Sequence, residues 1–195
     1  KINLIIFISE FNLGGAGNSL FKLCKNLPKN KFVISVVCLN KCFYKSELKK
    51  LGIKLYEIPS KSTFFAMLKL KKLTKNLIKS EYKNIFLSNI HFTNILSIIF
   101  LKSLNIKIIL VERTPFEELF IYYNLLDYIK KNIIKILIRF TFNKADMCIS
   151  NSKYISSKYN KYYNLRFKTI HPPSFKKMTN FSFKKNKIKK HISLG

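Results

Sequence analysis

Seven short apolar runs recur along the chain, separated by longer segments of helical period. The runs are Ile2–Ile8, Phe32–Leu39, Ile53–Ile58, Ile85–Ser88, Ile106–Val111, Met147–Ser150 and a weaker one at Phe167–Ile170. They are nearly continuous stretches of Ile, Val, Leu and Phe rather than apolar–polar alternations. Such runs are typical of parallel strands that helices bury on both faces. The pattern predicts an α/β fold, with a parallel, Rossmann-like sheet flanked by helices.

The segments between the runs have the 3.6-residue period of amphipathic helices. The predicted helices are Asn18–Asn26, Tyr44–Leu51, Phe64–Ser80 and a long helix at about Glu117–Phe142. In the long helix, many aromatic and aliphatic residues precede the basic ones. We expect this helix to present a hydrophobic and basic surface.

The apolar pattern ends at Pro172 and Pro173, after which the chain is polar and rich in lysine. A chain of 195 residues with 48% hydrophobic content can bury one core of about 150 residues. We therefore predict one α/β domain over residues 1–173 and a Lys-rich linker over residues 174–190. Residues 191–195 are expected to begin a second, carboxyl-terminal domain that is cut off here.

The chain is strongly basic, with 37 Lys and Arg against 9 Asp and Glu, a net charge of +28. Such a charge can indicate a nucleic-acid or an anionic membrane partner. Only Arg113, Arg139 and Arg166 are arginines, although nucleic-acid readers depend on Arg for bidentate and stacking contacts. The lysines are scattered and accompany abundant Ile, Asn and Phe, as AT-rich coding sequence produces. We expect no nucleic-acid partner, but a basic α/β nucleic-acid-binding module stays open as an alternative.

The cysteines and the apolar runs bear on where the protein resides. Cys24, Cys38, Cys42 and Cys148 lack Cys-x-x-Cys spacing and nearby histidines, so they are predicted to be reduced, buried thiols of a cytoplasmic protein. No apolar run approaches the roughly 18 residues that a membrane span requires. The protein is thus expected to be soluble or bound peripherally, at the inner face of the plasma membrane.

A glycine-rich loop directly follows the first run, and a predicted helix begins after it. Gly14, Gly15 and Gly17 would let backbone amides approach a phosphate, while Asn18 or Ser19 could cap the helix. A helix amino terminus behind such a loop attracts anions. The alternative is a tight turn without a ligand.

The loop departs from two common phosphate-binding motifs. A dinucleotide fingerprint would have glycine where Leu20 stands, and an acidic residue after the second run, which ends in Leu39–Asn40. An NTPase loop would have Lys and then Ser or Thr after its last glycine, whereas Asn18 follows Gly17. A Rossmann-like oxidoreductase or epimerase is therefore a disfavoured second alternative.

Polar residues follow three further runs at what should be the carboxyl edge of the sheet, where open α/β sheets bind ligands. His91 follows the fourth run, and it could be structural or functional. Glu112 and Arg113 end the fifth run, and they could pair with each other or face a ligand. Ser152 follows the sixth run and is suited to cap the next helix.

In this order, the pieces resemble the amino-terminal domain of retaining GT-B glycosyltransferases of the family 4 type, typified by lipopolysaccharide and capsule enzymes. The resemblance spans about residues 2–173. It rests on the Gly14–Gly15 loop, on His91 after the fourth strand, and on Arg139 followed by Ala145–Asp146 and a strand that leads to Ser152. Ile170–His171–Pro172 is similar to the family's boundary segment, although His171 stands where Asn is usual.

The resemblance implies that a hexose moves from a nucleoside-diphosphate sugar to a hydroxyl acceptor with retained configuration. It implies no cofactor and no bound metal, and the sequence has no Asp-x-Asp motif. The acceptor would be a saccharide or a lipid-linked precursor of a cell-surface polysaccharide or glycolipid. Most donor contacts would lie on the second domain, so this chain alone is expected to be inactive.

The same resemblance assigns roles to the residues of the first domain. It implies a catalytic role for His91, near the sugar. The glycine loop would contact the donor phosphate and sugar through Gly14, Gly15, Gly17 and Asn18. The cleft edge would be formed by Glu112, Arg113 and Ser152.

Overall fold

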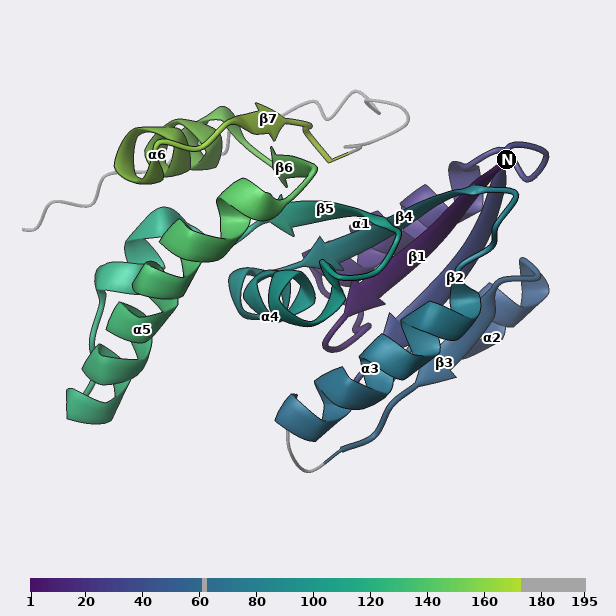
Figure 1. Ribbon diagram of the computed structural model, residues 1–195, viewed down its shortest axis with the longest axis horizontal. Coiled ribbons are helices and arrows are strands. Elements are labelled where there is room, and N and C mark those ends of the chain that lie inside the picture. Colours follow the sequence, from purple (N-terminus) through teal and green to yellow (C-terminus); the bar gives the residue numbers. More distant parts are fainter. Residues whose placement is uncertain (61–62, 173–195) are drawn as a thin grey trace, which may run out of the picture.

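The computed structural model describes residues 1–60 and 63–172 and contains a seven-stranded, fully parallel sheet (Figure 1). The order of the strands across the sheet is β3-β2-β1-β4-β5-β6-β7. Their bounds are β1 (Ile2–Ile8), β2 (Phe32–Cys38), β3 (Lys54–Glu57), β4 (Lys83–Asn89), β5 (Lys107–Glu112), β6 (Met147–Ser150) and β7 (Phe167–Thr169). The predicted parallel α/β sheet is confirmed.

Helices cover the two faces of the sheet unequally. They are α1 (Gly15–Asn26), α2 (Lys45–Lys50), α3 (Thr63–Leu77), α4 (His91–Leu101), α5 (Leu125–Thr141) and α6 (Lys153–Tyr163), with short 3-10 helices η1 (Phe116–Phe120) and η2 (Phe142–Lys144). Helices α1 and α2 contribute to one core cluster, and α3 to α6 contribute to the other. Because crossovers between parallel strands are right-handed, the helices change face when the chain returns from β3 to β4.

The alternation of side chains along β5 explains why both clusters are apolar. Ile108 and Leu110 are fully buried in the cluster with α4 and α5. Val111, which is 7% exposed, belongs to the cluster with α1, and Ile109 packs against it. Successive strand residues point to opposite faces, so a strand between two helical layers is apolar throughout.

The predicted long helix over residues 117–142 is wrong. The chain forms η1, then leaves helical geometry at Ile121, which has φ −93° and ψ 123°, and α5 begins only at Leu125. The Asn124 side chain accepts a hydrogen bond from Asp127 N at 2.8 Å. Asparagine is a strong N-cap, so Asn124 starts a new helix inside a segment whose periodicity looked continuous.

Several other expectations have mixed outcomes. The four cysteines are free and buried, as predicted, and burial raises the pKa of Cys24 to about 12.

Across the described residues, no helix combines the length and the apolar character needed to cross a membrane. The predicted linker (174–190) and the start of a second domain (191–195) lie outside the described residues, and the boundary at 173 stays a prediction.

Asp146 ties the beginning of β5 to the segment before β6. Its Oδ2 accepts a hydrogen bond from Ile108 N at 2.9 Å, and its own N donates to Ile108 O at 2.9 Å. The Ala145–Asp146 pair that carried part of the family resemblance thus has a structural role in aligning two strands.

We predict that Asp146→Ala lowers the free energy of unfolding by about 1 to 3 kcal/mol, because the Ile108 N–H loses its acceptor. Asp146→Asn is the matched control, since it keeps an amide oxygen at the same place and should lose less. Urea denaturation of the two variants measures both values. Equal losses in the two variants would show that the hydrogen bond is not the cause.

Candidate functional site

The carboxyl ends of β1, β4, β5 and β6 lie side by side, because these strands are consecutive neighbours in one parallel sheet. The chain turns toward one face after β1 and toward the other after β4, where α1 and α4 begin. Such a reversal leaves a crevice at the carboxyl edge, which is the usual ligand site of open α/β sheets.

The glycine loop ends in an uncapped helix amino terminus. Helix α1 begins at Gly15 with Gly14 as its N-cap residue, and no side chain caps it. The predicted capping by Asn18 or Ser19 is wrong, because Asn18 lies inside the first turn and donates its N–H to Gly14 O at 2.9 Å. The remaining first-turn N–H groups and the positive end of the helix dipole can bind an anion.

The three glycines of the loop have different surroundings. A Cβ on Gly17 would lie 1.9 Å from Asn12 O, so the backbone there leaves no space for a side chain. A Cβ on Gly14 would lie 3.0 Å from Asn12 Oδ1, which accepts a hydrogen bond from Gly14 N at 3.1 Å. Around Gly15 no atom lies within 4 Å of such a Cβ. Gly17 therefore serves packing within the loop, and Gly15 faces open space.

We predict opposite effects of alanine at these two positions. Gly17→Ala should lower the free energy of unfolding by about 1 to 3 kcal/mol, because the loop backbone must shift. Gly15→Ala should leave it unchanged or raise it by up to about 1 kcal/mol, because alanine favours a helix. Thermal and urea unfolding of both variants would test this, and a destabilised Gly15→Ala would contradict the account.

The turn between β4 and α4 positions His91 through an unusual backbone conformation. Ile90 has φ 76° and ψ 139°, which costs a β-branched residue about 1 to 3 kcal/mol. It is held by hydrogen bonds from Ile90 N to Val111 O (3.0 Å) and from Asn94 N to Ile90 O (2.9 Å). His91 is then the first residue of α4, at the carboxyl edge as predicted.

His91 lies in a partly buried, cationic environment. Burial and the charges of Lys130 and Lys131 lower the pKa of His91, so its imidazole is neutral at pH 7. Its Nδ1 is buried, and no group among the described residues pairs with it. A neutral imidazole offers one hydrogen-bond donor and one acceptor, which suits contact with a ligand hydroxyl.

Beside His91 lies a group of buried polar side chains that sequence analysis missed in part. Asn89, Asn94 and Glu112 have no exposed surface. Asn89 Nδ2 donates to Phe7 O at 3.2 Å, and Asn94 Nδ2 donates to Val111 O at 3.1 Å. Asn89 Oδ1, Asn94 Oδ1 and Glu112 Oε2 have no partner in the described part of the chain. Two features of the sequence could have indicated them: Asn89 ends an apolar strand, and Asn94 lies in an otherwise largely apolar helix.

Glu112 contacts the backbone of Arg113 rather than its side chain. Glu112 Oε1 accepts hydrogen bonds from Arg113 N (3.0 Å) and Thr114 N (3.1 Å), and no ion pair between the two side chains occurs within residues 1–60 and 63–172. Burial raises the pKa of Glu112 to about 7. Arg113 Nε is buried without a hydrogen-bond partner in that same region, and the Arg113 side chain as a whole is half-buried.

We predict that Glu112→Gln changes how stability depends on pH. With a folded-state pKa raised from 4.5 to about 7, Glu112 stabilises the fold fully below pH 4.5, and this contribution is lost as the pH rises to 7. The difference in unfolding free energy between wild type and Glu112→Gln should therefore fall by on the order of 2 to 3 kcal/mol across this range. Urea denaturation at about pH 5 and about pH 8 measures it; a constant difference would contradict the shift.

Arg113 and His91 lie in different parts of the edge. Arg113 lines an apolar pocket of about 520 Å³ between α1 and the strands β4 to β6, together with Ser19, Lys22 and Asn151. His91 is not among its lining residues. Ser152 caps α6 as predicted, and its Oγ accepts a hydrogen bond from Ile155 N at 3.2 Å. The hydroxyl of Ser152 is therefore already engaged by the backbone.

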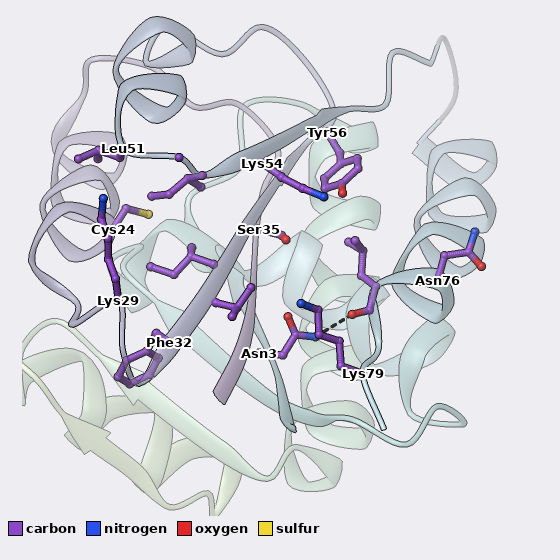
Figure 2. A pocket seen from close by; sticks show the side chains of 15 residues that line it. Asn3, Cys24, Lys29, Phe32, Ser35, Leu51, Lys54, Tyr56, Asn76 and Lys79 are labelled. Carbon is purple, nitrogen blue, oxygen red and sulfur yellow. Dashed lines mark hydrogen bonds between the residues drawn. The ribbon is translucent and has the colours of Figure 1, made fainter. Parts of the chain in front are cut away.

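A second pocket, of about 450 Å³, lies at the opposite edge of the sheet (Figure 2). Asn3, Phe32 and Lys54 from the amino ends of β1, β2 and β3 line it, with Lys29 and Lys79 beside them. Asn3 Nδ2 donates to Leu77 O at 2.7 Å. None of the site residues predicted from the sequence lies there.

The model of the family described as Glycosyltransferase Family 4 matches residues 13–173, which include the glycine loop and all the predicted site residues. The chain belongs to glycosyltransferase family 4. This membership favours a transferase over a nucleic-acid-binding module and over an oxidoreductase. No curated protein sequence gives a significant match to the chain.

Solved structures share the fold of this family 4 chain. The Anabaena protein Alr3699/HepE, in complex with UDP-glucose, is 12% identical with a TM-score of 0.63, over 88% of this chain and 44% of that one. A glycosyltransferase from Rickettsia africae ESF-5 is 17% identical with a TM-score of 0.60, over 88% and 43%. A portion of sucrose-phosphate synthase from Thermosynechococcus elongatus is 8% identical with a TM-score of 0.51, over 89% and 90%. The chain thus spans less than half the length of the first two proteins.

Proposed function

We propose that this chain forms one wall of the cleft of a glycosyltransferase that moves a hexose from a nucleoside-diphosphate sugar to a hydroxyl acceptor. The uncapped amino terminus of α1 carries the proposal, because Gly15 leaves space for a ligand at the positive end of the helix. The family match supports it, as does the UDP-glucose complex of the similarly folded Anabaena protein.

The donor diphosphate would bind at the N–H groups of Gly15 and Ala16, because the Gly14 N–H already donates to Asn12 Oδ1. The exposed Asn18 lies one turn further along α1. His91, the first residue of α4, would contact a sugar hydroxyl and so be the catalytic residue that this chain contributes. Arg113 would lie at the edge of the cleft, where its guanidinium would bind a donor or acceptor anion. The buried Glu112 would support that edge through the hydrogen bonds that it accepts from Arg113 N and Thr114 N. Ser152 would act indirectly, by fixing the start of α6.

The finer features of the activity rest on the resemblance to retaining enzymes. We propose that configuration is retained, that neither a cofactor nor a metal ion is needed, and that the acceptor is a saccharide or lipid-linked precursor of a surface polysaccharide or glycolipid. A second domain would supply most donor contacts, so the chain alone would bind donors weakly and transfer nothing. A cytoplasmic site of action agrees with a nucleotide-sugar donor.

We predict that UDP and UDP-glucose, titrated into ¹⁵N-labelled chain, shift the amide resonances of Gly14, Gly15 and Ala16 with millimolar affinity. Uridine is the matched ligand control and should shift them far less, because it lacks the diphosphate that the helix terminus attracts. The largest shifts at Asn3, Tyr56 and Asn76, which line the pocket at the opposite edge, would contradict the proposal. So would the absence of shifts.

The same titration separates the role of His91 from that of the loop. His91→Ala should remove the additional shifts that UDP-glucose causes relative to UDP, while UDP itself binds as before. Gly15→Leu should weaken both ligands, because its side chain enters the space proposed for the diphosphate. If His91→Ala leaves the UDP-glucose pattern unchanged, His91 does not contact the sugar.

A further inference from the structure

The beginning of α5 projects past the carboxyl edge of the sheet (Figure 1), and most of its exposed side chains are apolar. The first buried residue of α5 is Ile134, so more than two turns of the helix extend beyond the core. We call residues 121–133 the α5 overhang. Its large apolar side chains are exposed, three of them by more than 70%: Ile121, Tyr122, Tyr123 (83%), Leu125 (72%), Leu126 (78%), Tyr128, Ile129 and Ile133.

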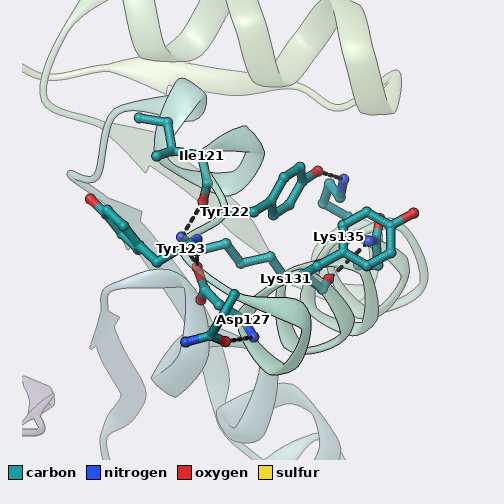
Figure 3. Close-up of polar contacts among 9 residues, drawn as sticks. Ile121, Tyr122, Tyr123, Asp127, Lys131 and Lys135 are labelled. Carbon is teal, nitrogen blue, oxygen red and sulfur yellow. Dashed lines mark hydrogen bonds and ion pairs between the residues drawn. The ribbon is translucent and has the colours of Figure 1, made fainter.

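Polar contacts hold the segment before α5 against the first turns of the helix (Figure 3). Lys131 Nζ donates to Ile121 O and forms an ion pair with Asp127 at 2.9 Å. Asp127 Oδ2 also accepts a hydrogen bond from Tyr123 N at 3.2 Å. Lys135 Nζ donates to the Tyr122 hydroxyl at 2.8 Å. These bonds fix the segment before α5 against the helix, so the apolar side chains are displayed by a defined structure.

The chemistry of the overhang indicates what would cover it. Its only acidic residue, Asp127, is paired with Lys131, so exposed Lys130 and nearby Lys135 leave the surface cationic. Protein interfaces are depleted in lysine, whereas an interfacial helix on an anionic bilayer combines lysines with aliphatic and aromatic side chains. Tyrosines such as Tyr123 and Tyr128 also suit the boundary between lipid and water.

We propose that the α5 overhang docks on an anionic lipid bilayer, with Tyr123, Leu125 and Leu126 inserted below the headgroups and the lysines at the phosphates. This proposal goes beyond the transfer reaction and does not depend on it. The overhang adjoins the candidate site, because the charges of Lys130 and Lys131 act on His91. Docking would hold the carboxyl edge beside the membrane surface, where a lipid-linked acceptor could reach it.

The chain contains no tryptophan, so a single introduced tryptophan reports on one position alone. We expect emission of Leu126→Trp to shift to the blue when vesicles of phosphatidylcholine and phosphatidylglycerol are added, because the indole enters the bilayer. Vesicles of phosphatidylcholine alone, or added salt, should weaken the shift. The control is Tyr82→Trp, at the amino edge before β4, whose emission should not change.

Binding measured by vesicle sedimentation gives a second test. Leu126→Asp should raise the lipid concentration for half-binding at least about tenfold, because burial of one leucine side chain in the bilayer strengthens binding by about that factor or more. Ile99→Asp alters an apolar residue that is 53% exposed on α4 and should bind as wild type does. The proposal is wrong if Leu126→Trp does not respond to anionic vesicles, if Tyr82→Trp responds equally, or if the shift arises without lipid at higher protein concentration.

Discussion

The return of the chain from β3, at the edge of the sheet, to β4, beside β1, organises the rest of the molecule. Because each crossover is right-handed, this return moves the later helices to the opposite face. It also makes β1 and β4 neighbours, so that the glycine loop and His91 follow adjacent strands and lead into helices on opposite faces of the sheet. The two apolar clusters that secure this arrangement draw on alternate residues of the same strands.

The carboxyl edge is energetically expensive compared with the core beneath it. Ile90 adopts a positive φ, and the oxygens of Asn89, Asn94 and Glu112 are buried without partners among the described residues. Each such group costs stability, and the apolar packing of β4 and β5 compensates for that cost. Strain and unpaired buried polar groups gathered at one edge of a sheet are more typical of a functional site than of a structural one.

Sequence patterns predicted the strands well, because apolar runs buried on two faces are hard to mistake. They also placed the glycine loop, His91 and Ser152 at strand ends, since a parallel sheet brings those ends to one edge. Helix ends were less predictable: α1 begins at Gly15, three residues before the predicted start at Asn18, and Asn124 divides a segment of continuous helical period. The burial of Glu112 and the roles of Asn89 and Asn94 depend on tertiary neighbours, which periodicity does not reveal.

We propose that this family 4 chain supplies one wall of a sugar-transfer cleft and needs a second domain for catalysis. The most direct measurement is sugar transfer from a panel of nucleoside-diphosphate sugars, by the chain alone and by a longer form that includes a second domain. The account predicts transfer by the longer form, its loss on Gly15→Leu, and none by the chain alone. Transfer by the chain alone, or undiminished transfer by the longer form with Gly15→Leu, would contradict it.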